Sequence, residues 1–160
     1  MNRVLRFGVM EDDAHFMRNA LEEAALAGAH DDVPVGCVIV ADGVILGKGE
    51  NRRELDRDPT AHAEIVALRE AARQRRHWRL DGATVYVTLE PCAMCAGALL
   101  SARVARLVIG AMDDKAGAVG SRYNLLSDPR LLHEVPTTYD VLGGDSTALL
   151  RNFFRERRVE

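Results

Sequence analysis

The chain has 160 residues, of which 48% are hydrophobic and 28% charged, and its formal net charge is −3. This length and composition are typical of one globular domain with its own core, and the charge excludes a protein that binds polyanions through a strongly basic overall surface. Every apolar run is shorter than the roughly 20 residues of a membrane span, and the N-terminal stretch MNRVLRFGVMEDD lacks the apolar segment of a signal peptide. We therefore expect a single domain over residues 1–160, located in the cytoplasm and not in a membrane.

The first half of the chain is predicted to form a helix, a hairpin and a second helix. Apolar residues recur at helical spacing over residues 12–27, and Gly28 is the predicted stop. The β-rich stretches VPVGCVIV and GVILGKG lie on either side of Ala41-Asp42-Gly43, which is a strong hairpin signal. Thr60 is the predicted N-cap of the next helix, which runs to about Gln74.

The second half of the chain alternates strands and helices. The pattern predicts strands at 84–89 and 104–111, a weaker strand near 135–141, and helices over 92–101 and from about 145. Strands that alternate with helices after an initial hairpin form a mixed sheet with helices on both faces. We therefore expect an α/β fold, a three-layer α/β/α sandwich around a central mixed five-stranded sheet. Sites in such sheets form at the carboxyl ends of strands and at helix N-termini.

Two motifs carry the chemistry, TAHAEIVALREAA and TLEPCAMCAG. His62 and Glu64 are two positions apart, so they would lie about 200° apart on a regular helix and can share a site only at its open first turn. Cys92 and Cys95 are three positions apart, which places both sulfur atoms on one face at the start of a helix, where the helix dipole stabilises thiolates. Two converging helix N-termini would bring one imidazole and two thiolates together.

One imidazole and two thiolates form a three-ligand zinc site. Structural zinc normally has four protein ligands, whereas catalytic zinc keeps one position for water and lowers the pKa of that water. Glu64 is not needed as a ligand and suits the role of a proton carrier beside the metal. We therefore predict a catalytic Zn²⁺ ion bound by His62, Cys92 and Cys95.

Other interpretations of these residues are open at this point. A CxxC pair alone also fits a thioredoxin-like redox site, but the upstream HAE motif and Pro91 favour metal binding. Cys37 would close the site as a fourth ligand, although its apolar surroundings, VGCVIV, favour a small buried hydrophobe. Glu64 has the alternative of being a first-turn acid that interacts with the helix dipole. No metal role is assigned to the other histidines, which are His15, His30, His77 and His133.

The two motifs together, H-x-E followed by P-C-x-x-C, are the signature of zinc-dependent nucleobase deaminases. The likeness extends over nearly the whole chain, from about Val9 to Arg158. The segments VPVGCVIV, GENRRE, DPTAHAEI, TVYVTLEPCAMCAGAL, DDKAGAVGS and LLRNFFRERR resemble the bacterial tRNA-specific adenosine deaminases. The zinc motif is shared with cytidine, cytosine and guanine deaminases, whereas the glycine-rich loop and the FFRERR ending point to the tRNA enzymes.

The resemblance implies a cytidine deaminase-like fold and a hydrolase that converts adenosine to inosine at wobble position 34 of an arginine tRNA with the anticodon ACG. It implies one zinc ion per subunit, bound by His62, Cys92 and Cys95, with Glu64 as the proton shuttle. It also implies a homodimer and an anticodon stem-loop as the substrate. Asn51 matches the family residue that hydrogen-bonds the flipped nucleoside, and its other interpretation is a turn asparagine after a strand.

Further RNA contacts are expected at two places. The family uses the glycine-rich loop near the RNA, which implicates Asp113, Lys115, Ser121 and Asn124, although such a segment is often simply a loop. The arginines of the last helix are placed to contact loop phosphates, although charge runs are usually solvated faces. These arginines are Arg155, Arg157 and Arg158.

Two other functions compete with a tRNA deaminase. A free-base or nucleoside deaminase, acting on guanine or cytosine, would use the same zinc site on a small substrate. A noncatalytic RNA-binding module would use zinc only for stability. The chain departs from the family at Cys37, where relatives often have alanine, and at Arg53, where proline is common, and neither change affects the predicted metal ligands.

Overall fold

The computed structural model describes residues 6–131 and 133–158. The remaining residues lie outside this description, among them the start of the N-terminal segment in which we expect no signal peptide. The helices are α1 (Asp13–Ala29), α2 (Ala63–Arg75), α3 (Ala93–Ala102), the short 3-10 helix η1 (Leu125–Ser127) and α4 (Gly143–Arg157). The strands are β1 (Gly36–Ala41), β2 (Val44–Glu50), β3 (Thr84–Leu89), β4 (Arg106–Ala111) and β5 (Thr137–Thr138).

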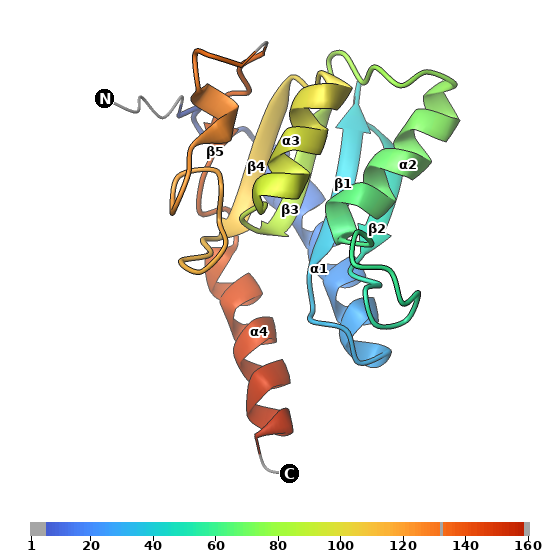
Figure 1. The fold of residues 1–160 in the computed structure, drawn as a ribbon, viewed down its shortest axis with the longest axis vertical. Coiled ribbons are helices and arrows are strands. Elements are labelled where there is room, and N and C mark those ends of the chain that lie inside the picture. The colour runs from blue at the N-terminus through green and yellow to red at the C-terminus, as the bar shows by residue number, and fades with distance from the viewer. Residues whose placement is uncertain (1–5, 132, 159–160) are drawn as a thin grey trace.

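The five strands form one mixed sheet in the order β2-β1-β3-β4-β5 (Figure 1). The strand β1 pairs antiparallel with both β2 and β3, whereas β3, β4 and β5 run parallel. A two-residue turn joins β1 to β2, and Asp42 and Gly43 both have positive φ angles, 51° and 74°. This is the geometry that matches the twist of a hairpin, as the sequence predicts.

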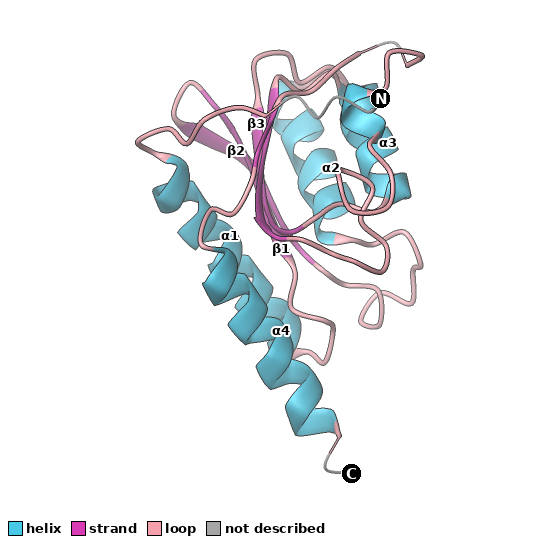
Figure 2. Ribbon diagram, turned by 90° about the vertical axis from the view of Figure 1, so that its left-hand side faces the viewer, coloured by secondary structure: helices cyan, strands magenta, loops and turns pink. Residues whose placement is uncertain are grey.

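The sheet lies between two helical layers, with α2 and α3 on one face and α1 and α4 on the other (Figure 2). Every residue of β1 and β4 is buried, because helices cover these strands on both sides. Ile39 and Leu99 belong to the larger core under α2 and α3, and Phe16 and Met17 belong to the smaller core under α1. The prediction of a three-layer sandwich with a mixed five-stranded sheet is confirmed. None of the described helices is long and apolar enough to cross a membrane.

Close contact between α2 and β2 determines where α2 begins relative to the sheet. A methyl group at Gly49 would overlap the main-chain oxygen of Ala63, and one at Gly47 would overlap the main-chain oxygen of Ala67. The two glycines therefore allow the helix backbone to lie directly on the strand. This packing holds the first turn of α2, which carries the HAE motif, against the sheet.

Some predicted boundaries are wrong by a few residues. Thr60 is not the N-cap of α2, because its N–H and hydroxyl both donate to Asp58 within the preceding turn, and His62 takes the N-cap position. Helix α1 passes through Gly28 and ends at Ala29, since the left-handed conformation falls at Asp31 instead. The weak strand predicted near 135–141 shrinks to β5, because left-handed residues follow it at 140 and 142.

A buried ion pair lies against the sheet beneath α1. Asp13, in the first turn of α1, is fully buried and faces Arg106 at the start of β4, with Nη2 and Oδ2 2.6 Å apart. The pair is bidentate, because Nη1 also donates to Oδ1 at 2.7 Å. Tyr86 and the main-chain N–H of Met10 donate to the same carboxylate. The pair therefore ties α1 and the segment before it to the central strands.

Candidate active site

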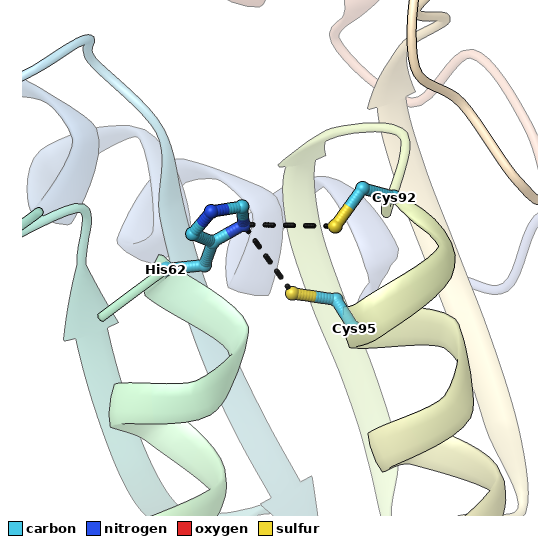
Figure 3. Close-up of side chains that lie close together, drawn as sticks. All are labelled: His62, Cys92 and Cys95. Carbon is cyan, nitrogen blue, oxygen red and sulfur yellow. Dashed lines mark hydrogen bonds between the residues drawn. The ribbon is translucent and has the colours of Figure 1, made fainter. Parts of the chain in front are cut away.

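Two helix N-termini meet in the way that the motif spacing predicts. His62 is the N-cap of α2 and Cys92 is the N-cap of α3, while Cys95 lies in the first turn of α3. The imidazole points toward both sulfur atoms (Figure 3). Its Nδ1 atom lies 3.7 Å from the Sγ of Cys92 and 3.6 Å from the Sγ of Cys95. The three side chains thus converge on one point, although 30 residues or more separate the histidine from the cysteines in sequence.

The separations between these atoms fit a tetrahedral zinc ion. Zn–N and Zn–S bonds of about 2.0 and 2.3 Å with tetrahedral angles place the nitrogen and sulfur atoms about 3.5 Å apart. The three potential ligand atoms lie within 4.8 Å of one another, and over residues 6–131 and 133–158 they are the group that could hold a metal ion. Cys37 is not part of this group and is fully buried in the larger core, as expected for a small hydrophobe. The prediction of His62, Cys92 and Cys95 as a convergent ligand set therefore has a geometric basis.

The protons on the ligand set are unevenly distributed. A hydrogen bond from Cys95, together with those of His62, lowers the pKa of the Cys92 thiol to about 3. The hydrogen bond to the Cys92 thiolate and burial raise the pKa of Cys95 well above its usual range. The hydrogen bond with Cys92 also raises the pKa of His62. Since a metal ion requires deprotonated ligands, zinc would displace these protons when it binds.

Glu64 lies beside the ligand set on the first turn of α2. It is only 4% exposed, and burial raises its pKa to about 7. A carboxyl group with a pKa near neutrality can both accept and return a proton, which is the property that a general acid–base catalyst needs. The environment of Glu64 therefore suits a proton carrier, although Glu64 is also the acid in the first turn of α2.

A pocket of about 210 Å³ opens onto Glu64, His62 and Cys92. Asn51 and Asp113 line it as well, from the end of β2 and from the loop after β4. Asn51 is buried, its Oδ1 accepts the N–H of Arg53 and its Nδ2 donates to the carbonyl of Val33. Asn51 thus shapes a turn and also lines the pocket, and its hydrogen bond to a nucleoside stays a prediction.

The four predicted RNA-contact residues of the glycine-rich loop do not share one environment. Asp113 lines the pocket, and its Oδ1 accepts the N–H groups of residues 115 and 116. Lys115 is exposed and outside the pocket lining. Ser121 donates its hydroxyl to Glu90, and Asn124 precedes η1, where its Nδ2 is buried. The structure therefore brings Asp113, but not Lys115, Ser121 or Asn124, to the pocket.

The three predicted arginines of α4 also differ. Arg157 lies over the ring of Phe153, with its guanidinium carbon 3.4 Å from the ring centroid, and pairs with Asp31 at 2.5 Å. Arg155 donates to Asn152 on the same helix and is exposed, and so is Arg158. Helix α4 continues beyond the sheet to the C-terminal end (Figure 1). All three arginines are thus exposed, but Arg157 is also engaged with Phe153 and with Asp31, which follows α1.

Several pocket residues were missed in the sequence. Val33 and Val35 precede β1, Ala116 lies in the glycine-rich loop, and Glu90 follows β3. Glu90 is 2% exposed. Its signal in the sequence is an acidic residue at the end of an apolar strand, directly before Pro91 and the first cysteine. The valines carry no such signal, because apolar pocket walls and core residues have the same composition.

Comparison with known proteins identifies the class. The profile of the cytidine and deoxycytidylate deaminase zinc-binding region matches residues 10–111. The chain is thus a member of the zinc-dependent deaminases, in agreement with the fold and the histidine–cysteine group. The tRNA-specific adenosine deaminase of Haemophilus influenzae is 48% identical over 151 residues, which cover 94% of this chain and 87% of the relative. That of Agrobacterium fabrum is 48% identical over 153 residues, covering 94% and 99%. The chain therefore belongs to the family of tRNA-specific adenosine deaminases.

Solved structures agree with this assignment. A structure from a study of A-to-I editing by tRNA:A34 deaminases at the wobble position of transfer RNA has a TM-score of 0.82 and 44% identity. The match covers 85% of this chain and 99% of that one. A guanine deaminase from Nitrosomonas europaea has a TM-score of 0.77 and 27% identity, covering 94% and 86%. The fold is thus shared across deaminases, whereas the identity is higher toward the tRNA enzymes.

Proposed function

We propose that this protein deaminates adenosine to inosine at wobble position 34 of a tRNA, and that the substrate is an arginine tRNA with the anticodon ACG. The observation that carries the proposal is Glu64, a buried carboxyl that lines the pocket beside His62, Cys92 and Cys95, with burial raising its pKa to about 7. The identity to tRNA-specific adenosine deaminases supports this substrate over a free base.

The metal ion and Glu64 have different roles in the proposed reaction. One zinc ion per subunit, held by His62, Cys92 and Cys95, supplies when bound a Lewis acid that lowers the pKa of water. Glu64 takes a proton from the attacking water and delivers it to N1 of the adenine as the water oxygen bonds to C6. It then carries the remaining proton of that oxygen to the amine, so that the C6–N bond breaks, ammonia leaves and inosine remains. Because its pKa lies near 7, Glu64 loses and regains a proton at little cost.

The pocket walls position the nucleoside. Asn51 and Asp113 both line the pocket, and they are proposed to contact the sugar or base through an amide and a carboxylate. A base must leave its stack to enter, which costs a few kcal/mol in a duplex and less in a single-stranded loop. An anticodon stem-loop, whose bases are already splayed, is therefore a favourable substrate.

Residues outside the pocket are proposed to contact the RNA, and the protein is proposed to pair with a second subunit. Arg155 and Arg158 are proposed to contact loop phosphates, because both are exposed on α4. Lys115, Ser121 and Asn124 are proposed to act through the shape of the glycine-rich loop or at its surface. We further propose a single-domain protein that forms a homodimer and acts in the cytoplasm. Light scattering on the purified protein measures the subunit number directly.

The test uses the zinc-loaded protein and four substrates: guanine, cytosine, adenosine and an ACG anticodon stem-loop. We expect inosine only from the stem-loop. Turnover of guanine or cytosine in preference to RNA would identify a free-base deaminase instead. Glu64→Gln should lower kcat by about 10²–10⁴-fold, the usual contribution of general acid–base catalysis, and retain zinc.

A matched control is Cys37→Ala, which alters a buried cysteine outside the ligand group. It should keep both zinc and turnover. If Glu64→Gln bound the stem-loop and the wild type did not deaminate it, the protein would be an RNA-binding module and the proposed function would be wrong.

A further inference from the structure

The loop between β4 and η1 wraps around a single buried side chain, Glu90. Its Oε1 accepts the N–H of Asp113 at 3.0 Å and the hydroxyl of Ser121 at 2.5 Å. Its Oε2 accepts the N–H groups of Val119 at 3.0 Å and Ser121 at 3.1 Å. A carboxylate has about four lone-pair sites on its two oxygens. The loop fills all four, so this carboxylate holds the loop at both of its ends.

The middle of the loop closes on the same group. A methyl group at Gly117 would overlap the carboxylate of Glu90, so only glycine allows the backbone to pass there. The next residue, Ala118, donates its N–H to the carbonyl of Pro91 at 2.8 Å. Glu90 itself is anchored, since its N–H donates to the carbonyl of Ala111 at 2.8 Å. Hydrogen bonds to Glu90 and Pro91 thus attach the loop to the end of β3.

This arrangement connects Glu90 to the pocket through Asp113. Asp113 is the loop residue whose main chain rests on Glu90 and whose position lines the pocket. We propose that Glu90 is a positioning residue for substrate binding, which holds Asp113 at the pocket wall while its own oxygens stay engaged with the loop. The proposal rests on the proposed function for the identity of the substrate.

The main test is Glu90→Gln in the full-length, zinc-loaded protein with the ACG stem-loop. Glutamine has nearly the same shape, but its amide nitrogen would face the N–H donors of the loop and could not accept their hydrogen bonds. Losing charge-assisted hydrogen bonds should raise KM about tenfold or more. Zinc content should stay unchanged, and kcat should change much less than KM, because the groups around the metal are intact.

Two further variants separate positioning from general stability. Glu70→Gln is a control outside the pocket: among the described residues, this half-buried glutamate of α2 accepts the N–H of Lys48 in β2. Its KM should stay at the wild-type value. Ser121→Ala removes one donor and should raise KM in the same direction as Glu90→Gln but by less, even if Glu90→Gln folds poorly. A lower melting temperature with unchanged KM in both loop variants would overturn the proposal.

A double-mutant cycle tests whether the effect passes through Asp113. If it does, Glu90→Gln should raise KM little further in a protein that already carries Asp113→Ala. Fully additive effects would show that Glu90 acts elsewhere and would contradict the proposal.

Amide hydrogen exchange gives a readout that does not depend on activity. The N–H groups of Val119 and Ser121 should exchange faster in Glu90→Gln than in wild type or Glu70→Gln. If the wild type failed to deaminate the stem-loop, the proposed function would fail, while the exchange rates would still decide whether Glu90 holds the loop. Unchanged exchange would overturn the role of Glu90 in either case.

Discussion

Replacing Asp13 by asparagine tests whether the buried ion pair with Arg106 stabilises the fold. The carboxylate is fully buried, and the guanidinium side chain is 8% exposed. Asparagine keeps one oxygen, for either Tyr86, which donates to Oδ1, or the N–H of Met10, which donates to Oδ2. It leaves the Arg106 charge without its counter-ion. The perturbation is therefore mainly electrostatic, with the loss of one hydrogen bond, and it changes the side-chain volume little.

The expected loss is large for a single substitution. Removing one partner of a buried pair costs about 3–5 kcal/mol, because the remaining charge stays buried. At an unfolding entropy of about 2.1 cal/mol/K per residue, this loss lowers the melting temperature of a chain of this length by roughly 9–15 °C. Asp81→Asn, which breaks an exposed pair with Arg79, should leave the melting temperature nearly unchanged, because solvent screens such a pair.

Thermal and urea unfolding of the zinc-loaded proteins measure these differences. Adding Arg106→Met to Asp13→Asn should recover part of the loss, because no unpaired charge is left. A loss below about 1 kcal/mol for Asp13→Asn, or a double variant less stable than the sum of the two single changes, would refute the reasoning.

Acid unfolding gives an independent check on the same pair. Burial alone would raise the pKa of Asp13, but the hydrogen bonds and charge of Arg106 and the N–H of Met10 lower it below the usual value of 3.8. The folded state is therefore harder to protonate than the unfolded state. The stabilisation is fully present above pH 3.8 and is lost as the pH falls through the lower pKa of the folded state. Asp13→Asn should lose less stability than wild type over that interval.

Three further predictions concern the positions of α2, the metal and α4. Gly49→Ala should displace α2, lower the melting temperature and weaken zinc retention. In the control Gly97→Ala, the new methyl group meets no described atom within 4 Å, so this change should stabilise α3 by about 0.5–1 kcal/mol. Chelation of zinc should lower the melting temperature and expose two thiols to a thiol reagent while buried Cys37 stays unreactive. Arg155→Gln should reduce the salt dependence of stem-loop binding without changing the melting temperature, as binding titrations at several salt concentrations would measure. Arg157→Gln should lower the melting temperature, as thermal unfolding would measure.

Much of the fold is predictable because local patterns decide it. The turn Asp42-Gly43 and the alternation of strands with helices are sufficient for the hairpin and the three layers. The boundaries are less predictable, because several groups compete to cap a helix. Thr60 is a good N-cap by residue type, but its hydroxyl donates to Asp58, and His62 is the N-cap of α2 instead.

The metal ligands are predictable for a chemical reason, whereas the rest of the pocket is not. His62, Cys92 and Cys95 need particular donor atoms at particular positions of two helix ends, so residue type and spacing restrict the choice. Many residue types can line a pocket wall, so residue type alone does not identify these side chains. Which of them reach the pocket depends on which strand ends are adjacent in the sheet. Glu90 meets the loop at Asp113 because β3 and β4 are parallel neighbours, so that their carboxyl ends lie side by side.

The arginines of α4 form one group in the sequence but have different neighbours in the structure. Arg155 and Arg157 have the same charge and lie two positions apart, so they point to different sides of the helix. The side that faces Asp31 is occupied by Arg157, and Phe153 lies one turn before it, where an arginine can cover the ring. Arg157 is thus exposed but already paired with Asp31, whereas no such pair with an acidic side chain is described for Arg155 or Arg158. Binding of RNA phosphates by α4 should therefore depend on Arg155 and Arg158 and only indirectly on Arg157, through the orientation of the helix.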